Sequence, residues 1–358
     1  MIPISRPTIG LEEEEAVLRV LRSGRLAAGP EVEAFEAAFA ALCDVPHAVA
    51  CSNGTAALHL ALLAHGIGPG DEVLVPAFTF AASAETVVAC GAIPVFCDVR
   101  SDDFCLDAAD ASRRVTPATR AVMPVHLYGQ VADMSAVMAL AERHGLVVIE
   151  DACQAHGATF DGRPAGSFAT AAFSTYATKN VMTGEGGLVT TSNAGVAERL
   201  RLLRAHGMPE RYVHTTFGLN MRMTDIQGAL GRVQLERLAA GNARRRENAA
   251  FYTAELDGID GLSLPRALPG REHVWHQYTV RVDSKREAVR QRLRDAGVGA
   301  EVYYPIPLHR QRAYAVDVSL PTSEALAAEV LSIPVFPGLS DAERATVAKM
   351  LADAMMEP

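Results

Sequence analysis

Lysine is almost absent from this 358-residue chain, which has only Lys179, Lys285 and Lys349 beside thirty arginines. Arginine therefore serves wherever positive charge alone is needed. A guanidinium stays protonated and cannot form an imine, whereas a lysine amine with a lowered pKa can attack an aldehyde. Lys179 has no charged neighbour between Phe173 and Glu185. It is a candidate imine-forming lysine, although an ordinary loop lysine explains the residue equally well when it is taken alone.

Excess positive charge, long apolar runs and paired cysteines are also missing. A net charge of −9 gives no basic footprint for nucleic acid and argues against an anionic membrane surface. No apolar run approaches the ~20 residues of a membrane span, and the N-terminus lacks a signal sequence, so we expect a cytoplasmic protein. The six cysteines, without a Cys-x-x-Cys pair, are expected to be core residues. His273 and His276 come closest to a metal spacing, but no third ligand is near, and no metal is predicted.

Short apolar runs alternate with alanine- and leucine-rich helical segments through the first two-thirds of the chain. Such strands, buried on both faces and separated by helices, predict an α/β three-layer domain with a mostly parallel sheet. The helical segments include 55–65 and 134–144. The predicted strands are 48–51, 72–76, 93–98, 121–125, 146–151 and 171–174.

From about residue 190 the pattern changes to longer helices, followed by a smaller α+β region that contains a strand at 277–282. We therefore predict a large domain over residues 1–240 and a small C-terminal domain over 241–358. We expect that the N-terminal helix segment can pack on the small domain. No proline- or glycine-rich linker marks the boundary.

Ligands of parallel sheets bind beyond the carboxyl ends of the strands, so residues that follow each apolar run are candidate site residues. Residues 52–55, Ser-Asn-Gly-Thr, follow one strand and open a helix, where small residues let backbone amides and the Thr55 hydroxyl approach an anion. Ser174 lies at another strand end, five residues before Lys179, and is positioned to bond a phosphate. An ordinary helix cap is the alternative for residues 52–55.

Two further strand ends complete the pattern. Asp151 ends the most apolar strand, where a carboxylate is costly without a partner, and a protonated ring nitrogen would supply one. Phe80 follows another strand and could lie flat on a ring. A helix cap and a core aromatic are the respective alternatives. Together these residues suggest a phosphate cradle, a stacking face, a ring-nitrogen partner and an imine lysine at successive strand ends.

Several long sequence blocks in the same order resemble the DegT/DnrJ/EryC1/StrS sugar aminotransferases, which are pyridoxal 5′-phosphate (PLP) enzymes of fold type I. The likeness covers essentially the whole chain. The blocks are residues 52–58, 68–73, 76–80, 150–155, 174–187, 220–227, 303–309 and 331–334. Three departures affect local packing and remove no chemical group: Cys153 replaces a common Ala, Thr175 a usual Phe, and Ala177 a common Pro.

The resemblance implies a role for each matching residue. Lys179 would form the imine with PLP, Asp151 would pair with the ring nitrogen, and Gln154 would contact the ring hydroxyl. Phe80 would stack on the ring. The residues implied as phosphate ligands are Gly54, Thr55, Ser174 and, from the partner subunit of a homodimer with shared active sites, Asn220.

The implied reaction is a two-stage transamination from L-glutamate to a nucleotide-linked keto-sugar, with Lys179 as covalent anchor and as general base and acid. The weaker candidates for sugar recognition are Arg222, Tyr303, Tyr304 and His309. Glu185, where relatives acting at carbon three more often have Asp, favours a 4-keto-6-deoxy sugar.

Other functions on the same scaffold remain open. Related sugar dehydratases have histidine in place of the lysine, which Lys179 argues against. A 3-keto-sugar or a carbocyclic ketone is an alternative acceptor. The alternative from another class is a non-catalytic regulatory protein with the PLP fold.

Overall fold

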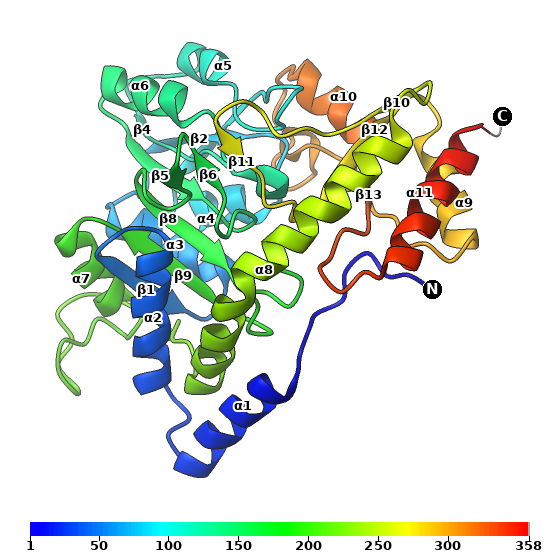
Figure 1. The fold of residues 1–358 in the computed structure, drawn as a ribbon. Coiled ribbons are helices and arrows are strands. Elements are labelled where there is room, and N and C mark those ends of the chain that lie inside the picture. The colour runs from blue at the N-terminus through cyan, green and yellow to red at the C-terminus, as the bar shows by residue number, and fades with distance from the viewer. Residues whose placement is uncertain (357–358) are drawn as a thin grey trace.

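A seven-stranded sheet forms the centre of the larger part of the molecule in the computed structural model, which describes residues 1–356 (Figure 1). Only β9 runs against its neighbours; the other pairings are parallel. All six predicted strands are present, and the sheet confirms the expected fold class. In spatial order the strands are β1 (His47–Cys51), β9 (Gly187–Thr191), β8 (Thr170–Ser174), β5 (Val147–Asp151), β4 (Thr119–Val122), β2 (Glu72–Pro76) and β3 (Ile93–Cys97).

Helices cover both faces of this sheet, and each face has its own buried cluster. One cluster includes side chains of α2 (Pro30–Leu42), α6 (Met134–His144) and α8 (Asp225–Leu256), with α5 (Ala108–Arg113) at its border. The other includes side chains of α3 (Gly54–Ala64), α4 (Ala82–Ala89) and α7 (Ala194–Leu203). The sheet is therefore the middle of three layers.

The long helix α8 packs closely on α2 because two glycines face it. A Cβ on Gly228 would lie 2.7 Å from the Val32 nitrogen, and one on Gly231 would lie 2.6 Å from the Phe35 ring. Glycine costs roughly 0.5–1 kcal/mol in a helix relative to alanine, so this close approach is a specific packing reason for both residues.

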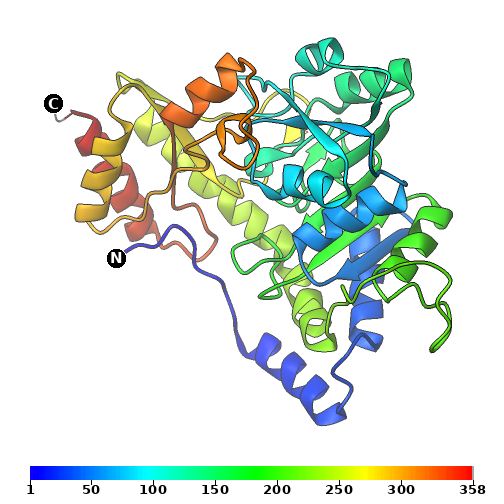
Figure 2. The ribbon, with the colours of Figure 1, turned by 180° about the vertical axis from the view of Figure 1, so that it is seen from behind.

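The C-terminal part is built on a second, three-stranded sheet (Figure 2). Its strands β10 (Leu262–Ser263), β12 (Tyr278–Val282) and β13 (Val330–Ile333) are antiparallel, and α9 (Arg286–Asp295) and α11 (Asp341–Met356) bury apolar side chains in the same core. A small third sheet joins β11 (Arg271–Glu272) to β6 (Thr159–Phe160), which also pairs with β7 (Arg163–Pro164).

Part of the C-terminal region returns to the large sheet. The 3-10 turns η1 (Leu127–Gly129) and η2 (Leu308–Arg310) and the helix α10 (Pro321–Glu329) lie in this region of contact. Leu308 and Leu320 belong to one cluster of the large sheet, and Leu326 belongs to the other. The C-terminal region therefore helps to build the edge where the strands end.

The proposed domain boundary at residue 240 falls inside α8, whose buried residues extend along its whole length into both parts. At the N-terminus, the extended residues pair with the small part: Ile2 N–H donates to Gly297 O at 2.8 Å. Helix α1 (Leu11–Ser23) instead packs on the first half of α8, where Gln234 donates to Glu13 at 2.8 Å. The division at 240 stays a prediction.

Within residues 1–356, no helix combines the length and apolar character that a membrane crossing requires. The same residues contain no cluster of three or more His, Cys, Asp or Glu side chains arranged to bind a metal ion.

Candidate active site

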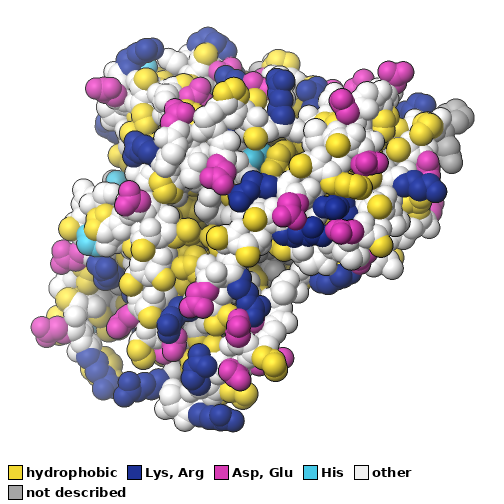
Figure 3. Space-filling view, in the orientation of Figure 1, with side chains coloured by type: hydrophobic (Ala, Val, Ile, Leu, Met, Phe, Trp, Pro, Cys, Tyr) yellow, Lys and Arg dark blue, Asp and Glu magenta, His cyan; other side chains and the backbone are white. Residues whose placement is uncertain are grey.

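The predicted site residues meet at the carboxyl edge of the large sheet. β1, β2, β5 and β8 all end there, because β9 is antiparallel to both of its neighbours and leaves β1 parallel to β8. In the view of Figure 1, hydrophobic side chains gather on the surface over the ends of the central strands beside α8, with charged side chains around them (Figure 3). The surface at this edge is therefore partly apolar.

A cradle for an anion is formed where α3 begins. Asn53 caps the helix by accepting from Ala56 N–H at 2.8 Å, and Thr55 lies exposed in the first turn. Gly54 faces Ser174 so closely that a Cβ at residue 54 would lie 2.6 Å from the Ser174 Cβ. The glycine thus keeps the helix N-terminus against the end of β8, an arrangement suited to a phosphate.

Asp151 is 6% exposed at the end of β5. Its Oδ2 accepts from Ser83 Oγ at 2.7 Å, and its Oδ1 accepts from Cys153 N–H at 3.2 Å. Ser83 lies in turn 3.2 Å from Thr79 Oγ1. Ser83 was not predicted as a site residue, because nothing in its local sequence distinguishes it from an ordinary helix serine. These bonds hold a carboxylate that is oriented toward the edge.

Lys179 follows β8 in a turn closed by a bond from its own N–H to Tyr176 O at 2.8 Å. Its side chain is only partly exposed, and this burial lowers its pKa, while Cys153 and Asp151 counter the shift. A lowered pKa leaves more of the amine neutral near pH 7, which both imine formation and proton abstraction require. The isolation of Lys179 in the sequence therefore corresponds to a chemically distinct amine.

Aromatic side chains line the other side of the edge. Phe80 is 56% exposed, and its ring centroid lies 6.0 Å from that of Tyr304 at a tilt of 40°. Gln154 accepts from Tyr128 N–H at 2.7 Å through Oε1 and donates to Tyr304 Oη at 3.4 Å. Tyr303 lies next to this group, with its carbonyl oxygen accepting from Tyr128 Oη. Phe80 is thus free to cover a ring.

The remaining predicted contacts come from two other segments, one of which lies beside the cradle, because Ser52 N–H donates to Met221 O at 2.8 Å. Arg222 and Asn220 are exposed, and Asn220 forms a bridge with Ala205, which follows α7. His309 is fully buried, with Nε2 3.0 Å from Glu324 Oε1. This contact links η2 to α10, and the substrate contact of His309 stays a prediction.

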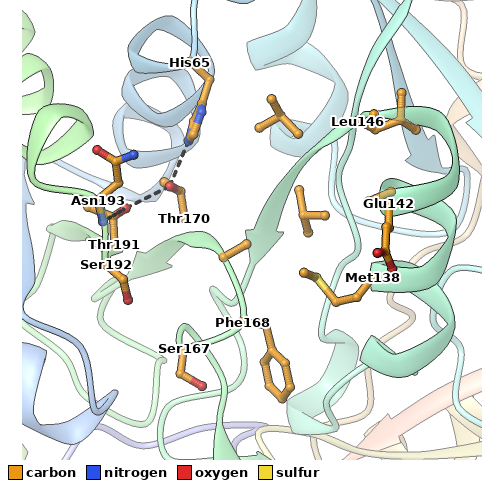
Figure 4. Close-up of a pocket in the computed structure, with 15 residues that line it drawn as sticks. His65, Met138, Glu142, Leu146, Ser167, Phe168, Thr170, Thr191, Ser192 and Asn193 are labelled. Carbon is orange, nitrogen blue, oxygen red and sulfur yellow. Dashed lines mark hydrogen bonds between the residues drawn. The ribbon is translucent and has the colours of Figure 1, made fainter.

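A cavity of about 680 Å³ lies at the opposite edge of the sheet, where β5 and β8 begin (Figure 4). His65 Nε2 lies 2.8 Å from Thr170 Oγ1 on its wall, and Thr170 lies 3.1 Å from Thr191. Because ligands of parallel sheets bind beyond the carboxyl ends of the strands, this cavity is not the candidate site despite its volume.

Comparison with known proteins assigns the family. The model of the DegT/DnrJ/EryC1/StrS aminotransferase family matches residues 7–352. The chain belongs to this family. The dTDP-3-amino-3,4,6-trideoxy-alpha-D-glucose transaminase of Streptomyces venezuelae is 46% identical over 334 residues, which cover 92% of this chain and 88% of the relative.

Two solved structures have the same fold. Streptomyces venezuelae DesV in complex with a ketimine intermediate matches with a TM-score of 0.94 and 44% identity, covering 97% of this chain and 95% of that one. The putative sugar aminotransferase Spr1654 of Streptococcus pneumoniae in its PLP form matches with a TM-score of 0.95 and 29% identity, covering 99% and 98%. This chain is an aminotransferase of fold type I, and PLP is its cofactor.

The residues at the edge fit this cofactor. The Gly54–Ser174 cradle, which a Cβ would fill, suits the phosphate, and the half-buried amine of Lys179 suits the aldehyde. Asp151 offers a carboxylate for the ring nitrogen, and the exposed face of Phe80 offers a surface for the ring.

Proposed function

We propose that this aminotransferase transfers an amino group from L-glutamate to a nucleotide-linked keto-sugar, with Lys179 as the reactive amine. The observation that carries the proposal is the convergence of Lys179, Asp151 and the Gly54–Ser174 cradle at one edge of the sheet. The sugar acceptor is supported by the activity named for the Streptomyces venezuelae relative.

Each residue has a separable task in this proposal. PLP, when bound, withdraws electrons from the carbon that loses a proton. Lys179 Nζ takes that proton from the amino donor and returns one to the acceptor carbon, as a general base and then an acid. Asp151, oriented by Ser83 and Cys153 N–H, would hold the ring nitrogen of bound PLP and keep it protonated. Gln154, oriented by Tyr128 N–H, would contact the ring hydroxyl.

The sugar is proposed to bind beside Tyr303 and Tyr304, with Arg222 as a further contact. The carbon-four position predicted from Glu185 stays a prediction: the Glu185 side chain is exposed, and the relative described above is named for a 3-amino product. A panel of 3-keto and 4-keto nucleotide sugars and a carbocyclic ketone, with products analysed by mass spectrometry, distinguishes the three acceptors.

We also propose a homodimer with shared sites, in which Asn220 reaches the partner's phosphate. The segment around it is unusually apolar for an exposed surface: Phe217 is 97% exposed, Tyr212 77% and Leu219 55%. Large exposed hydrophobic groups of this kind mark interaction surfaces. A cytoplasmic location stays a prediction.

The test of the proposed lysine uses borohydride, which fixes an imine covalently. Reduction of the PLP-loaded protein followed by peptide mapping should place the cofactor on the peptide that contains Lys179. Lys285 and Lys349 are internal controls in the same molecule, and label on either of them would refute the assignment. A protein that takes up no added PLP and shows no aminotransferase activity toward the whole panel would support the non-catalytic alternative instead.

A further inference from the structure

Asn180 is the residue after Lys179, and both the nitrogen and the oxygen of its side-chain amide form hydrogen bonds. Its Nδ2 donates to Asn242 Oδ1 at 2.9 Å and to Val274 O at 3.2 Å. Its Oδ1 lies 3.2 Å from His276 Nδ1. The three partners come from α8 and from the segment that leads into β12, so one side chain ties the lysine turn to two distant parts of the chain.

The orientation of each group in this network follows from two backbone carbonyls, which only accept hydrogen bonds. Asn242 Nδ2 donates to His156 O at 2.9 Å, so its Oδ1 is the acceptor that faces Asn180. Val274 O likewise requires the Nδ2 of Asn180. The Oδ1 of Asn180 therefore faces His276, which must carry its proton on Nδ1. If the amide of Asn180 were flipped, its oxygen would face Asn242 Oδ1 and Val274 O, which are also acceptors.

The segment 274–277 is itself fixed to the large sheet region and to α8. Backbone N–H groups at its two ends donate to Gly129 O at 3.0 Å and to Tyr128 O at 3.2 Å. Arg245, which is 5% exposed in α8, donates to two carbonyl oxygens within it at 3.1 and 3.2 Å. Asn180 is thus bonded to a rigid support.

We propose that Asn180 is a positioning residue for Lys179: through Asn242, Val274 and His276 it holds the lysine turn so that the amine stays in the partly buried edge beside Asp151. The inference rests on the proposed catalytic role of Lys179. It differs from that role because Asn180 contacts no reacting atom and acts only through the neighbouring residue.

The ionisable groups that face Lys179 come from two segments. Asp151, Cys153 and His156 belong to β5 and the turn after it, and His276 belongs to segment 274–277. Burial lowers the pKa of Lys179, and burial together with the nearby amine lowers the pKa of His156 to about 3 and that of His276 well below its ordinary value. Both histidines are neutral near pH 7. A loosened turn would return the amine to water, and its pKa would rise toward 10.5.

The experiment measures this amine directly in the cofactor-free protein. Trace acetylation across a pH series, followed by mass spectrometry, gives a titration curve for each lysine, and Lys285 and Lys349 serve as references in the same molecule. In the wild type, Lys179 should titrate below both references. In Asn180→Ala its midpoint should rise by about one pH unit, which is about a tenfold smaller neutral fraction at pH 8.

Two further variants separate positioning from a general loss of structure. Asn242→Ala removes the acceptor without altering the residue beside Lys179, and it should shift the midpoint in the same direction. Asn193→Ala, which removes the N-cap of α7 and its bonds to Gly195 and Val196, should leave the midpoint unchanged. In the PLP-loaded enzyme, Asn180→Ala should lower kcat at least tenfold with KM for glutamate within about threefold.

Unchanged Lys179 midpoints in both Asn180→Ala and Asn242→Ala, with folding confirmed by thermal melting, would refute the positioning role. An equal shift in Asn193→Ala would also refute it, because loss of any cap would then suffice. Neither result bears on whether Lys179 binds the cofactor, which borohydride labelling decides separately.

Discussion

Replacing Asp151 by asparagine tests whether its charge, rather than its shape, supports catalysis. The structure indicates that the variant should fold. The carbonyl oxygen of the introduced amide can still accept from Cys153 N–H, and the Ser83 hydroxyl can rotate to accept from the amide nitrogen, since Thr79 offers it a second partner at 3.2 Å. At most one hydrogen bond is weakened, at a cost of about 1 kcal/mol in unfolding free energy.

The effect on turnover should be much larger. A carboxylate held by two fixed donors is a pre-organised partner for a positive charge, and loss of one such group typically lowers kcat by about 10²–10³, or roughly 3–4 kcal/mol. PLP should remain bound, because the Gly54–Ser174 cradle and Lys179 are untouched. We therefore expect a yellow, folded Asp151→Asn protein whose kcat is about 10²–10³-fold below that of the wild type.

The assay follows 2-oxoglutarate formation from glutamate at a saturating keto-sugar concentration, with PLP content and melting temperature measured on the same samples. Asp98→Asn is the matched control. Asp98 is also a buried aspartate at a strand end, but it caps α10 through Thr322 N–H at 3.0 Å and Ser323 N–H at 2.8 Å. The Asp98→Asn variant should be less stable than the wild type but should have an unchanged kcat. If Asp151→Asn turned over within threefold of the wild type at full PLP content, Asp151 would be only a cap for the following turn.

Three other predictions follow from the same geometry. Gly54→Ala should weaken PLP binding at least tenfold in a cofactor titration, because its Cβ would lie 2.6 Å from Ser174 Cβ, whereas Gly68→Ala, with its nearest neighbour at 3.9 Å, should bind normally. Between the lowered folded-state pKa of Lys179 and 10.5 the unfolded chain binds more protons than the folded protein, so stability rises with pH only in that range. Cofactor-free Lys179→Met should therefore melt higher than the wild type at pH 7, and the gain should vanish above about pH 10.5. Mixing inactive Lys179→Ala and Asn220→Asp subunits should restore activity, and no rescue despite subunit exchange shown by mass spectrometry would refute the shared site.

Much of the scaffold was predictable because the signal is local. Each of the six apolar runs forms a strand, and burial on both faces makes such runs conspicuous. β9 was not predicted, because Leu188 and Val189 alone form its apolar run, which is shorter than the runs that mark the other strands. The predicted domain boundary near residue 240 lies inside α8, where no proline- or glycine-rich linker marks it, and it stays a prediction.

The candidate site was predictable where a residue type is chemically unusual for its place. Lys179 and Asp151 stood out because an isolated lysine and a carboxylate ending a buried strand require an explanation. Ser83, Asn180 and His276 did not, since each is ordinary in its local sequence and its role depends on partners up to 96 residues away. His309 is the opposite case: its local sequence favours a substrate loop, its side chain is fully buried, and the substrate contact stays a prediction.

The unpredicted strand β9 is also the reason that Lys179 lies at the right edge. A parallel strand after β8 would have to start at the opposite edge, and its connection would carry the chain away from the cradle. Because β9 is antiparallel, the connection 175–186 leaves and returns at the carboxyl edge. Thr175 closes its base, with N–H donating to Gly186 O at 2.8 Å and Oγ1 lying 2.6 Å from Thr183 Oγ1. Thr175 thus forms a hydroxyl pair with Thr183, and this pair closes the turn that presents the lysine.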